Sequence, residues 1–169
     1  MSRHVTFAPL EGFTLSHVRG PAARSTIESA VVDAPTRVLT ARTLPGGGFV
    51  ACLGKKEYFL MTPFVTLLLA PTRQDELTVT PRSDAIFQIS GKEAGVWLQQ
   101  TSPVNLADRP GDDFLMSRLL QISCWLTRAG VNGTSHRGFL IGCDPTYRDY
   151  FAEALTQSLQ NFEAALKAV

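Results

Sequence analysis

The stretches Val18-Arg19-Gly20-Pro21-Ala22-Ala23 and Ile89-Ser90-Gly91-Lys92-Glu93-Ala94 repeat one pattern at an offset of 71 residues. In each stretch an apolar strand ends, a glycine turns the chain, and a helix begins. Apolar residues at helical spacing follow each glycine and place one helix face on a core. They are Ala23, Ile27 and Ala30 in the first copy, and Ala94, Trp97, Leu98 and Thr101 in the second. The pattern predicts one small unit used twice.

Further apolar strands follow each predicted helix, at residues 49–53 in the first half and 119–126 in the second. Each of these strands is followed by another, at residues 58–61 and 138–141. Each half therefore reads strand, helix, strand, strand, and such a unit leaves an apolar sheet face uncovered. We expect an α+β fold in which two pseudo-repeated units share one core. The alternative is that two similar glycine turns coincide by chance.

The chain of 169 residues is long enough to bury a core of its own, and we expect a single domain. Within it, residues 1–12 are predicted to form an N-terminal arm of the kind that often lies on a neighbour. Residues 13–80 form the predicted first unit, and residues 81–169 the second. The joint between the units is predicted at residues 62–84, where three prolines limit any helix to a short piece.

Three helices are predicted from apolar residues at helical spacing, over residues 21–32, 92–100 and 145–168. Asp144 is the predicted N-cap of the last helix, which has the most regular pattern. The longest predicted strand spans residues 115–128, with Cys124 and Trp125 on opposite faces. A hairpin turn is predicted at residues 130–134.

The charge of the chain argues against several classes of partner. The formal net charge is +1 and no Lys/Arg cluster is present, so we expect no nucleic-acid partner. No apolar run approaches the length of a membrane span, and the first residues do not resemble a signal peptide, so we expect a cytoplasmic protein. Charged residues make up only 18% of the chain, which either is ordinary variation or reflects surface covered by other subunits.

The residue types that most often carry chemistry do not form a recognisable motif, and we predict no catalytic, cofactor-binding or metal-binding residue in this chain. Cys52, Cys124 and Cys143 are expected to pack as small apolar residues. His4 and His136 are expected at the surface, and His17 as a buried structural histidine. The acidic residues Asp108, Asp112 and Asp113 are expected in turns and caps, as are Gly46–Gly48 and Asn132-Gly133-Thr134.

Several short motifs occur in one order between residues 18 and 162. Residues 53–60, Leu-Gly-Lys-Lys-Glu-Tyr-Phe-Leu, are similar to an L-G-P-x-x-W-L stretch, and residues 89–94 to an L-S-G-P-x-A turn. Residues 102–106, Ser-Pro-Val-Asn-Leu, look like a C-P-L-D-L segment, and residues 121–128, 138–141 and 147–151 match a closing hairpin and helix. In this order they resemble the gamma subunit of heterotetrameric sarcosine oxidases, a small relative of the folate-binding aminomethyltransferase domain of the glycine cleavage T-protein.

The resemblance implies a non-catalytic structural subunit of a flavin-dependent complex that demethylates an N-methyl amine and passes the carbon to tetrahydrofolate. It implies alpha, beta and delta subunits as partners. The alpha subunit would carry NAD and tetrahydrofolate, the beta subunit the flavins FAD and FMN, and the delta subunit zinc. The identity of the amine would be decided by the flavin subunit.

Two other functions stay open at this stage. One is a stand-alone folate- or small-ligand-binding module, for which Asp84 or Glu93 is the candidate carboxylate to hold a pterin ring. The other is a self-contained aminomethyltransferase, which the short chain disfavours. For a structural subunit, Trp125 and Tyr58 are candidate interface anchors, with burial in the chain's own core the alternative for Trp125.

Overall fold

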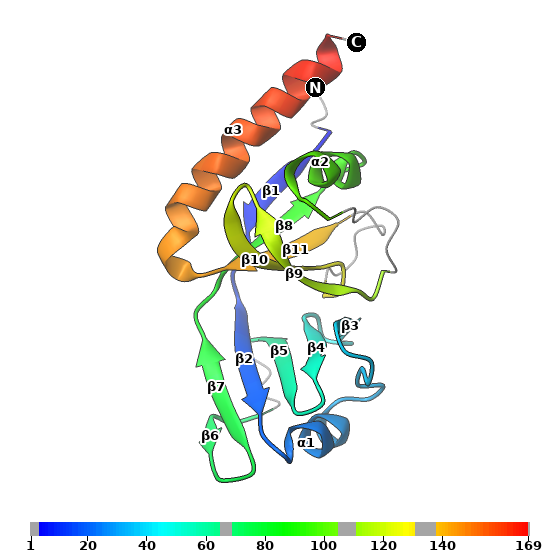
Figure 1. Ribbon diagram of the computed structural model, residues 1–169, viewed down its shortest axis with the longest axis vertical. Helices are drawn as coiled ribbons and strands as arrows, with labels where there is room; N and C mark the ends of the chain where they lie inside the picture. The colour runs from blue at the N-terminus through cyan, green and yellow to red at the C-terminus, as the bar shows by residue number, and fades with distance from the viewer. Residues whose placement is uncertain (1–3, 65–68, 105–110, 131–137, 169) are drawn as a thin grey trace.

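Two antiparallel β-sheets packed face to face form the centre of the computed structural model, which describes residues 4–64, 69–104, 111–130 and 138–168 (Figure 1). The first sheet has the spatial order β3 (Thr40–Thr43), β4 (Phe49–Gly54), β5 (Glu57–Pro63), β2 (Phe13–Arg19), β7 (Thr78–Arg82), β6 (Thr72–Arg73). The second has the order β9 (Phe114–Leu119), β10 (Ile122–Thr127), β11 (Phe139–Cys143), β8 (Ala85–Ser90), β1 (Thr6–Pro9). This is the expected α+β fold.

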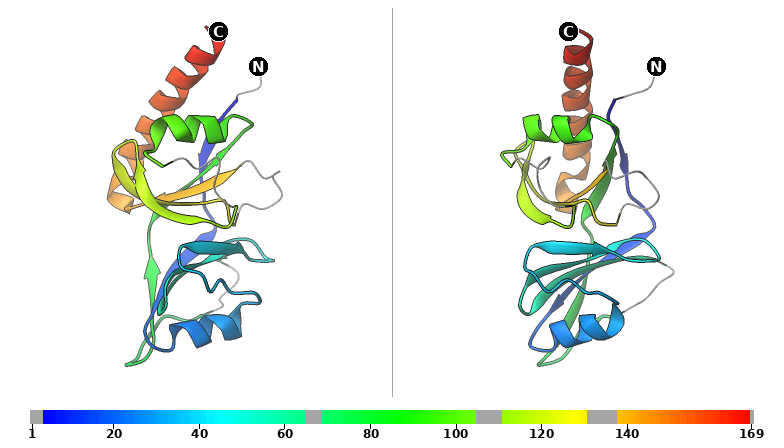
Figure 2. Two further views of the ribbon diagram at one scale, coloured as in Figure 1. Left: turned by 45° about the vertical axis from the view of Figure 1, so that its right-hand side comes forward. Right: turned by 90° about the vertical axis from the view of Figure 1, so that its right-hand side faces the viewer.

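Helices cover the outer faces of the two sheets, as the views in Figure 2 show. They are α1 (Ala23–Ala30) on the first sheet, and α2 (Ala94–Thr101) and α3 (Arg148–Lys167) on the second. A short 3₁₀ turn, η1 (Pro145–Tyr147), precedes α3, and the Asp144 carboxylate accepts a 2.9 Å hydrogen bond from the Thr146 N–H, as expected for a capping residue. No helix in the described ranges is long and apolar enough to cross a membrane.

The predicted repeat is confirmed at its two glycines. Gly20 and Gly91 have φ angles of +120° and +127°, and residues other than glycine rarely adopt such angles. At each, a neighbouring backbone carbonyl lies where a Cβ would stand, that of Glu76 at Gly20 and that of His4 at Gly91. The two turns therefore need glycine for the same two reasons, the backbone angle and the close approach of another segment of the chain.

The chain crosses between the two sheets after β1 and again after β7, which the sequence did not predict. Strand β1 comes directly before β2 in the chain, yet it pairs with β8 of the second sheet. Strand β7 comes directly before β8, yet it pairs with β2 of the first sheet. Residues 6–9, expected as part of an arm lying on a neighbour, thus pair within their own chain. The division at residues 12 and 80 itself remains a prediction.

The prediction of one long strand over residues 115–128 is wrong. The segment is a hairpin in which β9 and β10 pair antiparallel, with Leu119 opposite Ile122. Leu120 and Gln121 form its two-residue turn with φ angles of 49° and 69°. Turns of this kind usually contain Asn or Gly. Leu120 and Gln121 instead continue the strand-like alternation, so the turn could not be predicted from the pattern. The hairpin turn predicted further on, at residues 130–134, lies mostly outside the described residues.

The core consists of three layers of buried side chains. The central layer lies between the sheets and contains residues of both units, among them Leu15, Phe49, Met61, Phe114 and Trp125. The other two layers lie between each sheet and its helices. The shared core is therefore confirmed, and each unit also has a helix-covered core of its own, because both faces of each sheet are apolar.

Candidate functional site

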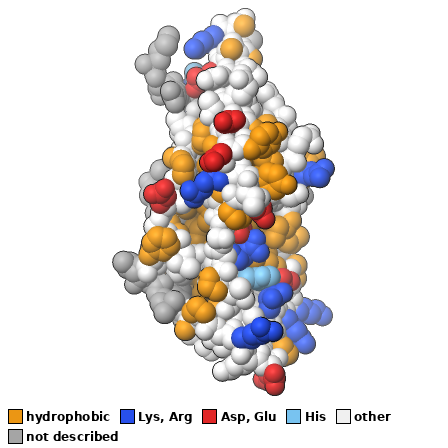
Figure 3. All heavy atoms as spheres, turned by 90° about the vertical axis from the view of Figure 1, so that its left-hand side faces the viewer, with side chains coloured by type: hydrophobic (Ala, Val, Ile, Leu, Met, Phe, Trp, Pro, Cys, Tyr) orange, Lys and Arg blue, Asp and Glu red, His pale blue; other side chains and the backbone are white. Residues whose placement is uncertain are grey.

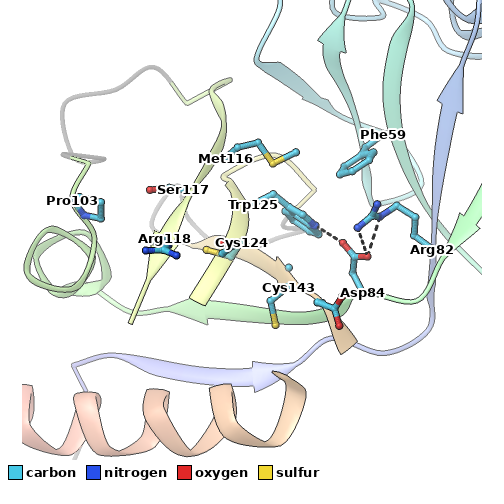
Figure 4. A pocket seen from close by; sticks show the side chains of 13 residues that line it. Phe59, Arg82, Asp84, Pro103, Met116, Ser117, Arg118, Cys124, Trp125 and Cys143 are labelled. Carbon is cyan, nitrogen blue, oxygen red and sulfur yellow. Dashed lines mark hydrogen bonds and ion pairs between the residues drawn. The ribbon is translucent and has the colours of Figure 1, made fainter. Parts of the chain in front are cut away.

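A groove of about 600 Å³ opens where the two sheets meet, and it is the best candidate site in the described part of the chain (Figure 4). Its walls include Phe59 and Arg82 from the first sheet and Met116, Arg118 and Trp125 from the second. The volume lies within the range of small-ligand pockets. The groove is formed by the pairing of the two units, because neither sheet alone supplies both walls.

Asp84 provides the buried charge of this groove, and its side chain is only 4% exposed. Its Oδ1 atom accepts a 2.9 Å hydrogen bond from Arg82 Nε and forms an ion pair with Nη2 of the same side chain at 2.8 Å. Its Oδ2 atom accepts a 2.8 Å hydrogen bond from the indole Nε1–H of Trp125. Both carboxylate oxygens are therefore bound by groups of the protein itself, one from each sheet (Figure 4).

The position of the Trp125 indole is fixed on several sides. Its ring stacks on Phe114 at 5.8 Å between centroids and meets Phe49 edge to face at 5.4 Å. It also lies against the backbone of Gly142, the residue directly opposite on β11, so closely that a Cβ at this position would overlap the indole ring. The absence of a side chain at Gly142 thus makes room for the indole that binds Asp84.

Arg82 joins the groove to a second polar pair. Its guanidinium carbon lies 4.9 Å from the centre of the Phe59 ring, and that ring is T-shaped to the His17 ring at 5.1 Å between centroids. His17 Nε2 lies 2.7 Å from Glu57 Oε1. Burial lowers the pKa of His17 below 6.5, and this effect outweighs the opposing hydrogen bond and charge of Glu57. His17 is therefore a neutral, partnered side chain, as the sequence predicts for a structural histidine.

The structure brings together only some of the residues that the sequence singled out. Asp84 lines the groove, whereas Glu93 stands at the start of α2, where its N–H meets the His4 carbonyl at 3.4 Å. Tyr58 and Trp125 are buried, at 1% and 3% exposure. Neither is an exposed interface anchor, so that prediction is wrong for Tyr58, and burial in the chain's own core is the correct alternative for Trp125.

The remaining predicted residues lie away from the groove or outside the described ranges. The side chain of Asp112 forms ion pairs of 3.5 Å with Arg37 and with Arg42, in keeping with its predicted place in a turn. His4 is half-buried. Asp108, His136 and the stretch Asn132-Gly133-Thr134 lie outside the described residues.

The three cysteines are buried and free, as predicted for packing residues. Cys124 and Cys143 also line the groove. Burial raises the pKa of the Cys124 thiol to about 12 and that of Cys143 to about 11.

The two partners of Asp84 were not predicted from the sequence. Trp125 is 41 positions away, and Arg82 belongs to no motif. The only available signal was the position of Arg82, two residues before Asp84.

Comparisons with known proteins bear on this geometry. No protein-family model matches the sequence, and no curated protein is significantly similar to it. Among solved structures, a chain of the heterotetrameric sarcosine oxidase from Corynebacterium sp. U-96, in complex with pyrrole 2-carboxylate, superposes with a TM-score of 0.78 at 19% identity. The match covers 96% of this chain and 87% of that chain. This chain has the fold of a heterotetrameric sarcosine oxidase chain.

The same fold occurs in a longer enzyme. The glycine cleavage system aminomethyltransferase T from Bartonella henselae superposes with a TM-score of 0.66 at 17% identity, over 90% of this chain. Only 45% of the aminomethyltransferase is covered. The expected likeness to an aminomethyltransferase folate-binding domain is confirmed as a fold, and the chain spans less than half of that enzyme.

Proposed function

We propose that this chain is a non-catalytic, gamma-type structural subunit of a sarcosine oxidase-like complex. The observation that carries the proposal is the extent of the likeness. The match to the sarcosine oxidase chain covers nearly all of both chains, whereas less than half of the aminomethyltransferase is covered. A subunit of similar size and fold fits the first pattern better than an enzyme that lacks half of its length.

The groove supports a structural role for its polar residues. A carboxylate that binds a pterin ring needs oxygen lone pairs directed at the ligand. The Asp84 oxygens are instead bound by Arg82 and Trp125, and the side chain is almost fully buried. The charge at the groove thus joins a side chain of the first sheet to one of the second.

In this proposal the chemistry belongs to partner subunits. Alpha, beta and delta subunits would accompany this chain, with NAD and tetrahydrofolate on alpha, FAD and FMN on beta, and zinc on delta. The complex would oxidise an N-methyl amine and transfer the carbon to tetrahydrofolate. This chain would contribute surface, and its described residues include exposed aromatic side chains at the start of α3, Tyr147 at 50% and Tyr150 at 60% exposure.

These tyrosines replace Trp125 and Tyr58 as candidate interface anchors. Tyr side chains are enriched at interface hot spots because they bury a large ring at little entropic cost. On the side of the molecule that carries α3, Figure 3 shows hydrophobic side chains exposed across the middle and a group of Lys and Arg side chains below them. This mixed surface is typical of an interface with an apolar centre and a polar rim.

Purification of the tagged chain from its native host tests the proposal. We expect larger subunits to co-elute in fixed proportion, identified by mass spectrometry, with flavin absorbance in the eluate. A Tyr147→Ser/Tyr150→Ser variant should lose these partners, while Gln160→Ser, an exposed change on the same helix, should keep them. A colourless protein that elutes alone would contradict the proposal.

A stand-alone ligand-binding module is the second candidate, favoured by the size of the groove beside Asp84. Calorimetry with tetrahydrofolate on the isolated chain separates the two functions. Binding that is lost in the Asp84→Asn variant would favour the module. The absence of binding heat, together with co-eluting subunits, would favour the structural subunit.

A further inference from the structure

Two cysteines face each other across neighbouring strands of the second sheet. Cys124 on β10 is directly opposite Cys143 on β11 in the antiparallel register. Directly opposed residues of an antiparallel pair project from the same face, and both side chains belong to the same buried layer under α2 and α3. The two thiols are therefore neighbours, and the negative charge of one would raise the pKa of the other.

The hairpin turn reveals which kind of pair the two cysteines form. In a hairpin with a two-residue turn, the residues that flank the turn exchange both backbone hydrogen bonds, so Leu119 and Ile122 form such a pair. The backbone groups of Ile122 and Cys124 then point toward β9, and those of Trp125 toward β11. Cys124 and Cys143 consequently form a non-hydrogen-bonded pair between β10 and β11.

Non-hydrogen-bonded pairs bring strands closest together, with Cα atoms about 4.5 Å apart. A disulfide requires a Cα separation of about 4.4–6.8 Å, so the register alone places this pair within bonding range. In Figure 4 the two sulfur atoms point in different directions. Closure therefore requires rotation about χ1 to another staggered position, with no change of strand register.

The pair lies beside the groove. Cys124 and Cys143 are 6% and 2% exposed as whole residues and both contribute to the groove lining, while their side chains pack in the layer under α2 and α3. Cys52, the third cysteine, lies in the layer under α1, and its thiol donates a 3.5 Å hydrogen bond to the Gly54 carbonyl. It therefore differs from the pair in both position and partner.

We propose that Cys124 and Cys143 are a redox-active dithiol that a small two-electron oxidant such as hydrogen peroxide closes to a disulfide between β10 and β11. One thiol ionises and its thiolate attacks a peroxide oxygen; the O–O bond breaks, a sulfenic acid forms, and the departing hydroxide takes up the released proton to give one water. The second thiol then attacks the sulfenyl sulfur and displaces a second water. Two thiols lose two electrons, and one peroxide is reduced to two waters.

Closure of the pair depends on pH in a defined direction. The attacking group is a thiolate, and burial holds the pKa values of Cys143 and Cys124 at about 11 and about 12. The rate of closure rises about tenfold per pH unit between neutral pH and pH 10, because the thiolate fraction does. The dithiol is thus a slow oxidation site at neutral pH.

The test uses the full-length Cys52→Ser variant, which retains only the pair, treated with hydrogen peroxide under native conditions. Alkylation of the remaining thiols in denaturant, followed by peptide mass spectrometry, is expected to show a Cys124–Cys143 linked peptide that is lighter by two hydrogen atoms. The oxidised chain is also expected to melt at a higher temperature, because the cross-link reduces the entropy of the unfolded chain. A Cys52→Ser/Cys143→Ser variant is the matched control and is expected to form no intramolecular link.

A second probe does not depend on the folding of that control. Phenylarsine oxide binds two adjacent thiols, with loss of water, and one equivalent is expected to bind the native Cys52→Ser chain. The proposal is wrong if native protein binds no arsenical and forms no link under conditions that oxidise the urea-unfolded chain. This test of the dithiol is independent of the proposed subunit function, since both measurements use the isolated chain.

Discussion

The contact between Asp84, Arg82 and Trp125 predicts a measurable loss of stability when its charge is removed. Asp84→Asn keeps the size of the side chain but removes the negative charge that accepts from Arg82 and the indole. Breaking a fully buried ion pair costs about 3–5 kcal/mol. Arg82 is 37% exposed and can be hydrated again when its partner is lost, so we expect a smaller loss of about 2 kcal/mol.

Equilibrium urea unfolding followed by fluorescence measures this loss of unfolding free energy. Thermal unfolding gives a second measurement: domains of this size lose about 2–4 °C of melting temperature per kcal/mol, so Asp84→Asn is expected to melt about 4–8 °C lower. Asp75→Asn, an exposed position on the first sheet's side, is the matched control and is expected to behave as wild type. Equal urea midpoints for the two variants would refute a stabilising role for the Asp84 contacts.

A double-mutant cycle separates the hydrogen bond from the packing of the indole. Trp125→Phe keeps an aromatic ring against Phe114 but leaves Asp84 Oδ2 without its donor, at a cost of about 1–3 kcal/mol. Because the two residues contact each other, the double variant is expected to lose less than the sum of the single losses. Trp97, in the layer under α2 and α3, reports unfolding in every variant. Strict additivity would show that the two residues do not interact.

Three further predictions follow from particular contacts. Gly91→Ala should destabilise the chain by about 2 kcal/mol or more, because the φ of Gly91 is +127° and a backbone carbonyl occupies the position of the new Cβ. The control Gly95→Ala should raise the urea midpoint slightly, because Gly95 lies inside α2 with open space around it. Gly142→Ala should displace the Trp125 indole, seen as a change in its emission and near-ultraviolet circular dichroism at unchanged secondary structure. Because the folded pKa of His17 lies below 6.5, the unfolded chain binds its proton first, so stability should fall as pH drops below 6.5, and His17→Asn should flatten this profile.

The elements that depend on local chemistry could be predicted from sequence. Gly20 and Gly91 mark turns that only glycine tolerates, and the apolar spacing after them identifies α1 and α2. The Asp144 cap and the helix that follows were equally local. The turn at Leu120 and Gln121 was missed, because it takes positive φ angles with residues that give no turn signal.

Features that depend on pairing between distant segments could not be predicted. Strand β1 pairs with β8, and no property of residues 6–9 selects that partner over the nearer β2. Asp84 was singled out as a possible ligand-binding carboxylate, but its actual role depends on Trp125, which the fold brings to it from the other side of the groove. Periodicity shows that a side chain is buried, and only the assembled sheets show what it contacts.

The crossing of the chain from β7 to β8 explains the position of the charged contact. Arg82 ends β7, and Asp84 follows it in the connection that leads to β8 of the other sheet. The carboxylate therefore lies where the chain crosses between the sheets, and Trp125 binds it from the second sheet. Separating the sheets would break this contact. A ligand in this groove would therefore either compete with Arg82 and Trp125 for the Asp84 carboxylate or bind other polar side chains of the lining, such as Ser117 and Arg118.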